Sequence, residues 1–212
     1  VIFRYDLSEF RKDKYSKEIS LIRSLYSEQE RTIQALILNL YRQELATSNN
    51  INLKPVILFK AKRTIRESEQ NKESFHTLIE NLSVANVEGI QKTSTVFIVQ
   101  KAFRFFASKG ISYEEIVKRI QSNFKFENCL SANNDTEAEK NQILLNTLED
   151  ENNPIRAVFA VQKLNEGWDV LNLFDIVRLY DDRDGKDGKP GTTTISEAQL
   201  IGRGARYFPF AL

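Results

Sequence analysis

Two arginines near the end of the sequence, Arg203 and Arg206, have the residue type and spacing for phosphate chemistry. In a helix they would share one face with Gln199, because residues three and four apart are neighbours on a helical surface. Two guanidinium groups on one face require a polyanion or paired carboxylates opposite them. A fixed guanidinium can stabilise the charge that spreads over a phosphoryl group during its transfer. The alternative is that the two arginines belong to a salt-bridge network on the protein surface. The glycines Gly202 and Gly204 would let this region press against a partner.

A second motif, Glu166-Gly167-Trp168-Asp169-Val170, follows an apolar stretch that predicts a strand over 155–161. Gly167 would let the backbone approach a ligand at the carboxyl end of a parallel strand, where such sheets bind ligands. Asp169 could accept hydrogen bonds from a sugar hydroxyl, or it could merely cap a turn. Trp168 abuts the apolar strand, which favours a place in the core over stacking on a ligand.

A complete active site cannot be assembled from these residues. The sequence contains no Gly-x-x-x-x-Gly-Lys-Ser/Thr phosphate loop, and Gly188-Lys189-Pro190 lacks both the upstream glycine and the hydroxyl. No paired acidic motif for magnesium follows a predicted strand, and the single histidine, His76, lies in a helical, charged stretch that does not suit a Ser/His/Asp triad. We therefore expect half of a site, and a chain without hydrolytic activity by itself.

The two motifs together resemble motifs V and VI of superfamily-2 helicases and translocases: Glu-Gly-Trp-Asp-Val at 166–170, then Gln-x-x-Gly-Arg-x-x-Arg at 199–206. Longer stretches more narrowly resemble the restriction (Res) subunit of type III restriction-modification enzymes. These are residues 160–173, 196–207, 14–19 and the strand at 55–59, which corresponds to motif IV.

The resemblance implies a role for individual residues. Arg203 and Arg206 align with arginine fingers that reach the phosphates of ATP, which with Mg²⁺ is held mainly by a first lobe outside this sequence. Gln199 aligns with a residue that contacts the γ-phosphate or its attacking water. The ATP-binding positions are Gly167, Asp169 and Gly202, and the positions implied for nucleic-acid contact are Lys60, Lys62, Asn133 and Asn165. The resemblance implies no metal ligand in this chain.

The same resemblance implies partners: double-stranded DNA, the first motor lobe in the same parent chain, and a methyltransferase subunit that reads sequence. The parent would also carry a nuclease domain further on. Two alternatives stay open. One is another superfamily-2 DNA motor, such as a repair translocase without a nuclease; the other is a non-catalytic nucleic-acid-binding module that has kept the fold.

The pattern of elements predicts an α/β fold, a RecA-like parallel sheet flanked by helices. Residues 1–26 are interpreted as a connector from the first lobe, and 27–212 as the second motor lobe. Ser27 and Glu30 form a predicted capping box before an amphipathic helix over 28–46. Its apolar face would comprise Ile33, Leu36, Ile37, Leu40, Tyr41 and Leu45.

A mostly helical insertion is expected over about 63–126, with helical pieces at 68–82 and 112–123 and a β-rich patch at 95–99. The aromatic residues of this region could form its core or, with neighbouring cations, a nucleic-acid surface; these residues are Lys101, Phe103, Arg104, Phe105 and Phe106. Beyond it the sequence predicts strands at 128–130, 155–161 and 176–180. It also predicts a helix over 135–148, a loop over 181–194, and a final helix over 197–205 capped by Ser196.

Composition is that of an ordinary globular protein, with 41% hydrophobic and 28% charged residues. The formal net charge of +1 gives no global basic field, so nucleic-acid contacts would depend on local placement of cations. One cysteine, Cys129, and one histidine, His76, exclude an internal disulfide and a zinc site, as expected of a cytoplasmic protein. We expect Cys129 in the core and His76 on a solvated helix face. No apolar run approaches the ~18 residues of a membrane span. The absence of methionine and the start at Val1 in a predicted strand indicate part of a longer polypeptide.

Overall fold

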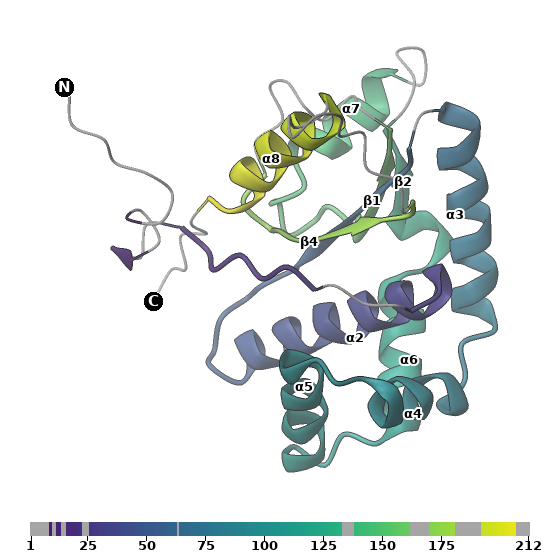
Figure 1. Ribbon diagram of the computed structural model, residues 1–212, viewed down its shortest axis with the longest axis vertical. Helices are drawn as coiled ribbons and strands as arrows, with labels where there is room; N and C mark the ends of the chain where they lie inside the picture. Colours follow the sequence, from purple (N-terminus) through teal and green to yellow (C-terminus); the bar gives the residue numbers. More distant parts are fainter. Residues whose placement is uncertain are drawn as a thin grey trace, which may run out of the picture.

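Four parallel strands form the centre of the molecule in the order β2-β3-β1-β4 (Figure 1). They are β1 (Val56–Lys60), β2 (Cys129–Ser131), β3 (Ala157–Ala160) and β4 (Leu173–Arg178). The computed structural model describes residues 9, 12–13, 16–22, 26–62, 64–132, 138–161, 170–180 and 192–206. Within them, parallel strands with helices on both faces make an α/β fold that is compatible with the predicted RecA-like class.

Strand β1 is buried over its whole length, as its short apolar sequence predicted. Successive side chains of a strand point to opposite faces of the sheet. Ile57 and Phe59 accordingly belong to one apolar core, whereas Val56 and Leu58 belong to a second core on the other face. The sheet therefore separates two packed layers, each of which must be covered by helices.

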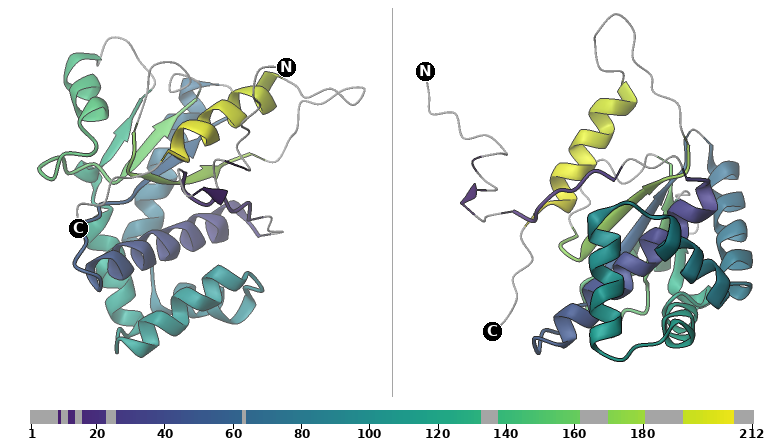
Figure 2. Two further views of the ribbon diagram at one scale, coloured as in Figure 1. Left: turned by 90° about the vertical axis from the view of Figure 1, so that its left-hand side faces the viewer. Right: turned by 60° about the horizontal axis from the view of Figure 1, so that its bottom comes forward.

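The first face is covered by α2 (Glu28–Thr47), which contacts β1 and β4, and by α3 (Ile65–Glu80), which contacts β2 and β3. Three further helices, α4 (Val84–Thr93), α5 (Phe97–Ser108) and α6 (Tyr113–Asn123), pack against α2 on the side away from the sheet (Figures 1 and 2). The region predicted as an insertion thus contains one helix on the sheet and three in an outer layer.

The second face is covered by α7 (Ala138–Asn146) and α8 (Thr192–Gly204) (Figure 1). Leu144 and Leu145 of α7 pack against the core of this face, and Leu200 of α8 is 2% exposed within it. A 3₁₀ turn, η1 (Phe126–Asn128), leads from α6 into β2. The final helix is therefore on the opposite side of the sheet from α2 and the outer helices.

Helix α2 begins where the capping box predicted. The Glu30 backbone N–H donates to Ser27 Oγ at 3.3 Å, and the Ser27 N–H donates to Glu30 Oε2 at 2.9 Å. The one-sided apolar face was wrong, because residues 32–41 are all buried and Leu45 is 38% exposed. The outer helices cover the side of α2 that the sequence pattern assigned to solvent. Its buried Asn39 amide accordingly donates to the Pro55 carbonyl at 3.1 Å.

Other boundaries differ from the sequence predictions. The β-rich patch at 95–99 is wrong as a strand, because α5 begins at Phe97 and buries Val99 against its helical neighbours. Helix α8 begins at Thr192, so Ser196 lies inside the helix and cannot be its N-cap. Strand β4 begins three residues before the predicted start at Ile176 and ends at Arg178. In the described part of the chain, no helix is long and apolar enough to cross a membrane.

Candidate functional site on helix α8

Helix α8 has one face on the sheet and one away from it. Leu200 is buried, and Gly204 lies so close to β4 that a Cβ atom there would be 3.2 Å from Leu173 Cδ2. Gln199, Gly202 and Arg206 are exposed, and a Cβ on Gly202 would meet open space. Gly204 therefore packs on the sheet of this chain and Gly202 does not, while the approach of the two glycines to a partner stays a prediction.

Arg203, the first predicted finger, is half-buried. Its Nη1 atom is buried without a hydrogen-bond partner among the described residues. A buried donor that makes no hydrogen bond costs about 1–3 kcal/mol. A phosphate or carboxylate oxygen could accept from this donor if the buried Nη1 atom became accessible to it.

Arg206, the second predicted finger, is exposed just beyond the end of α8. It pairs with Ser16 in an isolated antiparallel β-bridge. The bridge fixes the backbone of Arg206 and leaves its side chain on the surface. Gln199 and Arg203 thus lie on α8, whereas Arg206 lies beyond its end, so the helical face predicted for all three does not extend to Arg206.

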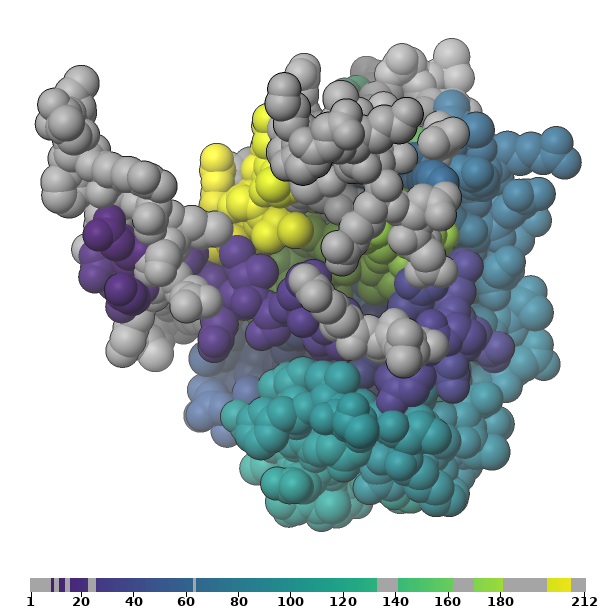
Figure 3. Space-filling view, viewed as in Figure 1, coloured from purple at the N-terminus to yellow at the C-terminus, as the bar shows by residue number. Residues whose placement is uncertain are grey.

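Lys17, in the predicted connector, holds the end of this helix. Its ammonium donates to three backbone carbonyls: Leu171 at 2.5 Å, Leu173 at 2.9 Å and Gly204 at 2.9 Å. Its own backbone N–H donates to the Ala205 carbonyl at 2.8 Å. Figure 3 shows the connector residues in purple against the yellow surface of α8. Segments 187 residues apart in sequence therefore meet at one cation.

The environment of Lys17 is largely dry. Burial lowers the pKa of its ammonium from 10.5 to about 8, with Arg42 adding to the shift and Glu149 opposing it. The ammonium also lies 4.3 Å from the centre of the Phe174 ring. A cation at a helix C-terminus is stabilised by the helix dipole and the unpaired carbonyls there. Sequence reasoning assigned no role to Lys17, since nothing in its local pattern indicates partners so distant in the chain.

Four predicted site residues, Asn133, Asn165, Gly167 and Asp169, lie outside the described residues, as does Trp168. Their assignment to ATP or to nucleic acid stays a prediction. Val170, the first described residue after the motif, is 4% exposed in the core beneath α8.

The residues predicted to contact nucleic acid from β1 have different environments. Lys60 is the last residue of β1 and only 4% exposed, whereas Lys62 is half-exposed. A phosphate contact from Lys60 would require that side chain to become accessible. Ser131, at the end of β2, donates from Oγ to Glu69 Oε2 on α3 at 3.1 Å. Of the two lysines, Lys62 is therefore the one accessible to a ligand in this structure.

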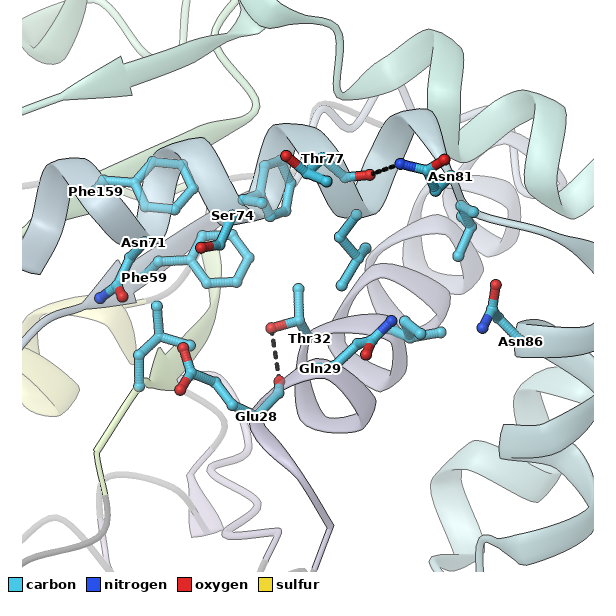
Figure 4. A pocket seen from close by; sticks show the side chains of 15 residues that line it. Glu28, Gln29, Thr32, Phe59, Asn71, Ser74, Thr77, Asn81, Asn86 and Phe159 are labelled. Atoms are coloured by element: carbon cyan, nitrogen blue, oxygen red, sulfur yellow. Dashed lines mark hydrogen bonds between the residues drawn. The ribbon is translucent and has the colours of Figure 1, made fainter.

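A cavity of about 500 Å³ lies on the other face of the sheet from α8, between α2 and α3 (Figure 4). Phe59 and Phe159 form part of its apolar floor, and amide and hydroxyl groups line its rim, among them Asn71, Ser74 and Asn81. None of the predicted site residues lines it. This cavity is therefore not the site that the sequence motifs predict.

A smaller polar cavity of about 230 Å³ lies beside residues that precede the strands. Arg156 lines it, 6% exposed, and donates to Gln43 Oε1 at 2.6 Å and Asn39 Oδ1 at 3.3 Å. Lys54 also lines it and donates to the backbone carbonyls of Asp150 and Asn153. These contacts hold together the segments that precede β1 and β3.

Phe103 and Phe106 of α5 belong to the core, and Phe105 is partly buried against it, which favours the core over a basic surface for these three rings. Phe103 is 4% and Phe106 1% exposed, and the Phe106 ring packs edge-on against Tyr41 of α2 at 6.3 Å. Cys129 is buried, as predicted. His76, predicted to be solvated, is instead half-buried with its ring 4.6 Å from that of Phe126, and burial lowers its pKa. Among the described residues, no group of His, Cys, Asp and Glu is arranged to hold a metal ion.

Comparison with known proteins gives one extended match. The chain is 35% identical over 93% of its length to a Haemophilus influenzae protein named "Probable type III restriction-modification enzyme HindVIP Res subunit". The aligned region spans 43% of that relative. The similarity supports the Res-subunit family that the sequence motifs indicated. A family model described as the HI_1054_N N-terminal region matches residues 193–212. No solved structure matches the chain significantly.

Proposed function

We propose that this chain is the second ATPase lobe of a DNA-dependent motor, in the restriction subunit of a type III restriction-modification enzyme. The observation that carries the proposal is the arrangement of α8. Gln199 and the half-buried Arg203 lie on this helix and the exposed Arg206 follows it, while Leu200 and Gly204 fix the helix to β4. A helix anchored in this way can present guanidinium groups to a ligand held by another lobe without reorganising them.

The hydrogen-bond donors of Arg203 and Arg206 suit the phosphates of ATP. Arg203 has a buried donor without a partner among the described residues, and Arg206 is exposed two residues after Gly204. ATP would supply the phosphoryl group, held with Mg²⁺ mainly by a first lobe that carries the phosphate loop. The role of this chain is to place fixed positive charge, from Arg203 and Arg206, where negative charge develops. Gln199, on the same helix as Arg203, would orient the water that attacks.

The proposal extends to the parent enzyme through the similarity to the Res subunit. In that enzyme, opening and closing of the two lobes would drive movement along double-stranded DNA. A methyltransferase subunit would supply sequence recognition, and a nuclease domain would cut the DNA. The RecA-like fold class and the boundaries of connector, lobe and insertion are part of this proposal, which the parallel sheet order and the helices on both faces support.

The test uses the full-length parent enzyme and compares wild type with Arg206→Ala. Removing an arginine finger lowers turnover by about 10³–10⁵. We expect DNA-stimulated ATP hydrolysis to fall by at least a hundredfold, with the Kd for ATP within a few-fold of wild type. Steady-state hydrolysis and equilibrium nucleotide binding measure the two effects separately. Near wild-type turnover of Arg206→Ala would exclude a finger at this position.

The matched control is Lys118→Ala, which removes a positive charge from the exposed face of α6, in the outer layer and away from α8. This variant should hydrolyse ATP at the wild-type rate. A loss equal to that of Arg206→Ala would indicate a general effect of surface charge on DNA binding rather than a finger.

A further inference from the structure

Lys17 connects two parts of the molecule that the proposed motor would need to move together. The three N–H donors of its ammonium are all used, on the carbonyls of Leu171, Leu173 and Gly204. Two of these acceptors precede or begin β4, and the third is the last residue of α8. The cation therefore joins the connector, the strand and the helix at one point.

The contact lies beside both predicted fingers. Gly204 follows Arg203 directly, and Ala205, whose carbonyl accepts from the Lys17 backbone, precedes Arg206. The bridge between Ser16 and Arg206 continues the same backbone pairing. A shift of residues 16 and 17 would thus move the backbone that carries both arginines.

We propose that Lys17 is a positioning residue that couples the connector to the arginine-bearing helix and sets the guanidinium groups for ATP hydrolysis. The inference rests on the proposed motor function. In a motor of two lobes, the connector leads from one lobe into the other, so relative movement of the lobes acts on residues 16–22. Lys17 transmits that movement to the end of α8.

Several features make Lys17 suited to this role. Its ammonium is largely desolvated and faces a carbonyl-rich site, so its hydrogen bonds are charge-assisted. The other groups that face it are the Phe174 ring at 4.3 Å, the Glu149 carboxylate and the Arg42 guanidinium. Glu149 Oε1 itself accepts from the Leu171 backbone N–H at 2.6 Å, which fixes the loop that supplies one of the acceptors.

The experiment compares Lys17→Met with Lys54→Met in the full-length enzyme. Lys54 is the matched control because it also donates to backbone carbonyls and has a pKa lowered to about 8, mainly by burial, but its ammonium binds the carbonyls of Asp150 and Asn153 and none on α8. Both variants lose a buried cation, so both should lower the melting temperature. We expect only Lys17→Met to lower kcat for ATP, by at least tenfold, with KM within about twofold when both are assayed well below melting.

Equal loss of kcat in the two variants, or wild-type kcat in Lys17→Met, would overturn the inference. Arg206→Ala, assayed alongside, separates this outcome from failure of the motor proposal. If Arg206→Ala loses turnover and Lys17→Met does not, only the role of Lys17 is wrong. If Arg206→Ala keeps turnover, the motor proposal itself fails.

A second measurement covers the case in which Lys17→Met does not fold. Loss of a proton leaves Lys17 with two donors for three carbonyls, so wild-type kcat should fall as the pH rises through about 8. Lys17→Arg keeps its charge throughout this range and should move the fall to higher pH. An identical alkaline limb in Lys17→Arg and wild type would contradict the proposed coupling.

Discussion

Gly204 of α8 packs directly on Leu173 of β4, with only 3.2 Å between the position of a Cβ on the glycine and Leu173 Cδ2. Leu173 is 2% exposed in the core of this face and has little room to retreat. Gly202, on the same helix, has open space at the corresponding position. Gly204 is therefore required for close packing on β4, whereas nothing in the structure requires a glycine at position 202. Substitutions at the two positions can test this difference.

The glycine pair predicts opposite effects on stability. Gly202→Ala removes a poor helix former from an exposed position and should stabilise the protein by about 0.5–1 kcal/mol. Gly204→Val forces branched carbon atoms against Leu173 and should destabilise it by about 1–3 kcal/mol. Urea unfolding followed by circular dichroism gives both free energies. Equal changes in the two variants would mean that α8 does not pack on β4 as described.

The ion pair between Arg42 on α2 and Asp175 on β4 predicts a substitution whose effect on stability depends on pH. Arg42 Nη1 lies 2.7 Å from Asp175 Oδ1 and 2.6 Å from Oδ2, with the aspartate side chain 11% exposed. Arg42→Ala leaves a buried carboxylate without its cation, and such losses reach about 3–5 kcal/mol. We expect the lower end, because the Arg42 side chain is 28% exposed.

The sign of the pH effect follows from the carboxyl group. Burial raises the pKa of Asp175, and Arg42 opposes the shift. Without Arg42 the pKa rises further, so protonation in acid removes the uncompensated charge. The destabilisation by Arg42→Ala should therefore shrink as the pH falls, in parallel denaturation curves. Lys92→Ala breaks only an exposed pair with Glu88 and should leave the unfolding midpoint unchanged at every pH.

We predict that the buried Cys129 thiol does not react while the protein is folded. Burial raises its pKa from 9.0 to about 12, which lowers the thiolate fraction near pH 8 by about 10³. Its Sγ also lies 3.3 Å from the Lys125 carbonyl oxygen. An aromatic disulfide reagent should label it only in denaturant. Native labelling at the denatured rate would place this thiol outside the core.

The sequence predictions were most accurate where local chemistry decides the structure. The capping box of Ser27 and Glu30 was correct, because its hydrogen bonds join residues three apart. The apolar stretches of β1 and β3 were correct, because strands buried on both faces need continuous apolar side chains. The predicted final helix carries Gln199 and Arg203, but it ends at Gly204, so the helical face predicted for Arg206 was wrong.

The features that the sequence did not predict depend on packing between residues far apart in the chain. The patch beginning at Thr95 has the β-branched residues of a strand, but Val99 and Phe103 are buried four residues apart on one side of a helix. The exposure of Leu45 depends on where the outer helices end. The role of Lys17 depends on carbonyls more than 150 residues away, which no local pattern records.

The burial of α2 on all sides has a consequence for dissecting the molecule. Residues 32–41 have the sheet on one side and α4, α5 and α6 on the other. Excising residues 84–123 would remove the Phe105 and Phe106 rings that pack on Tyr41 and would expose the apolar outer side of α2, including Leu38 and Tyr41, to solvent. Whatever those three helices contribute to the parent enzyme, they are not a removable accessory. A shortened version made without them would aggregate before its activity could be assayed.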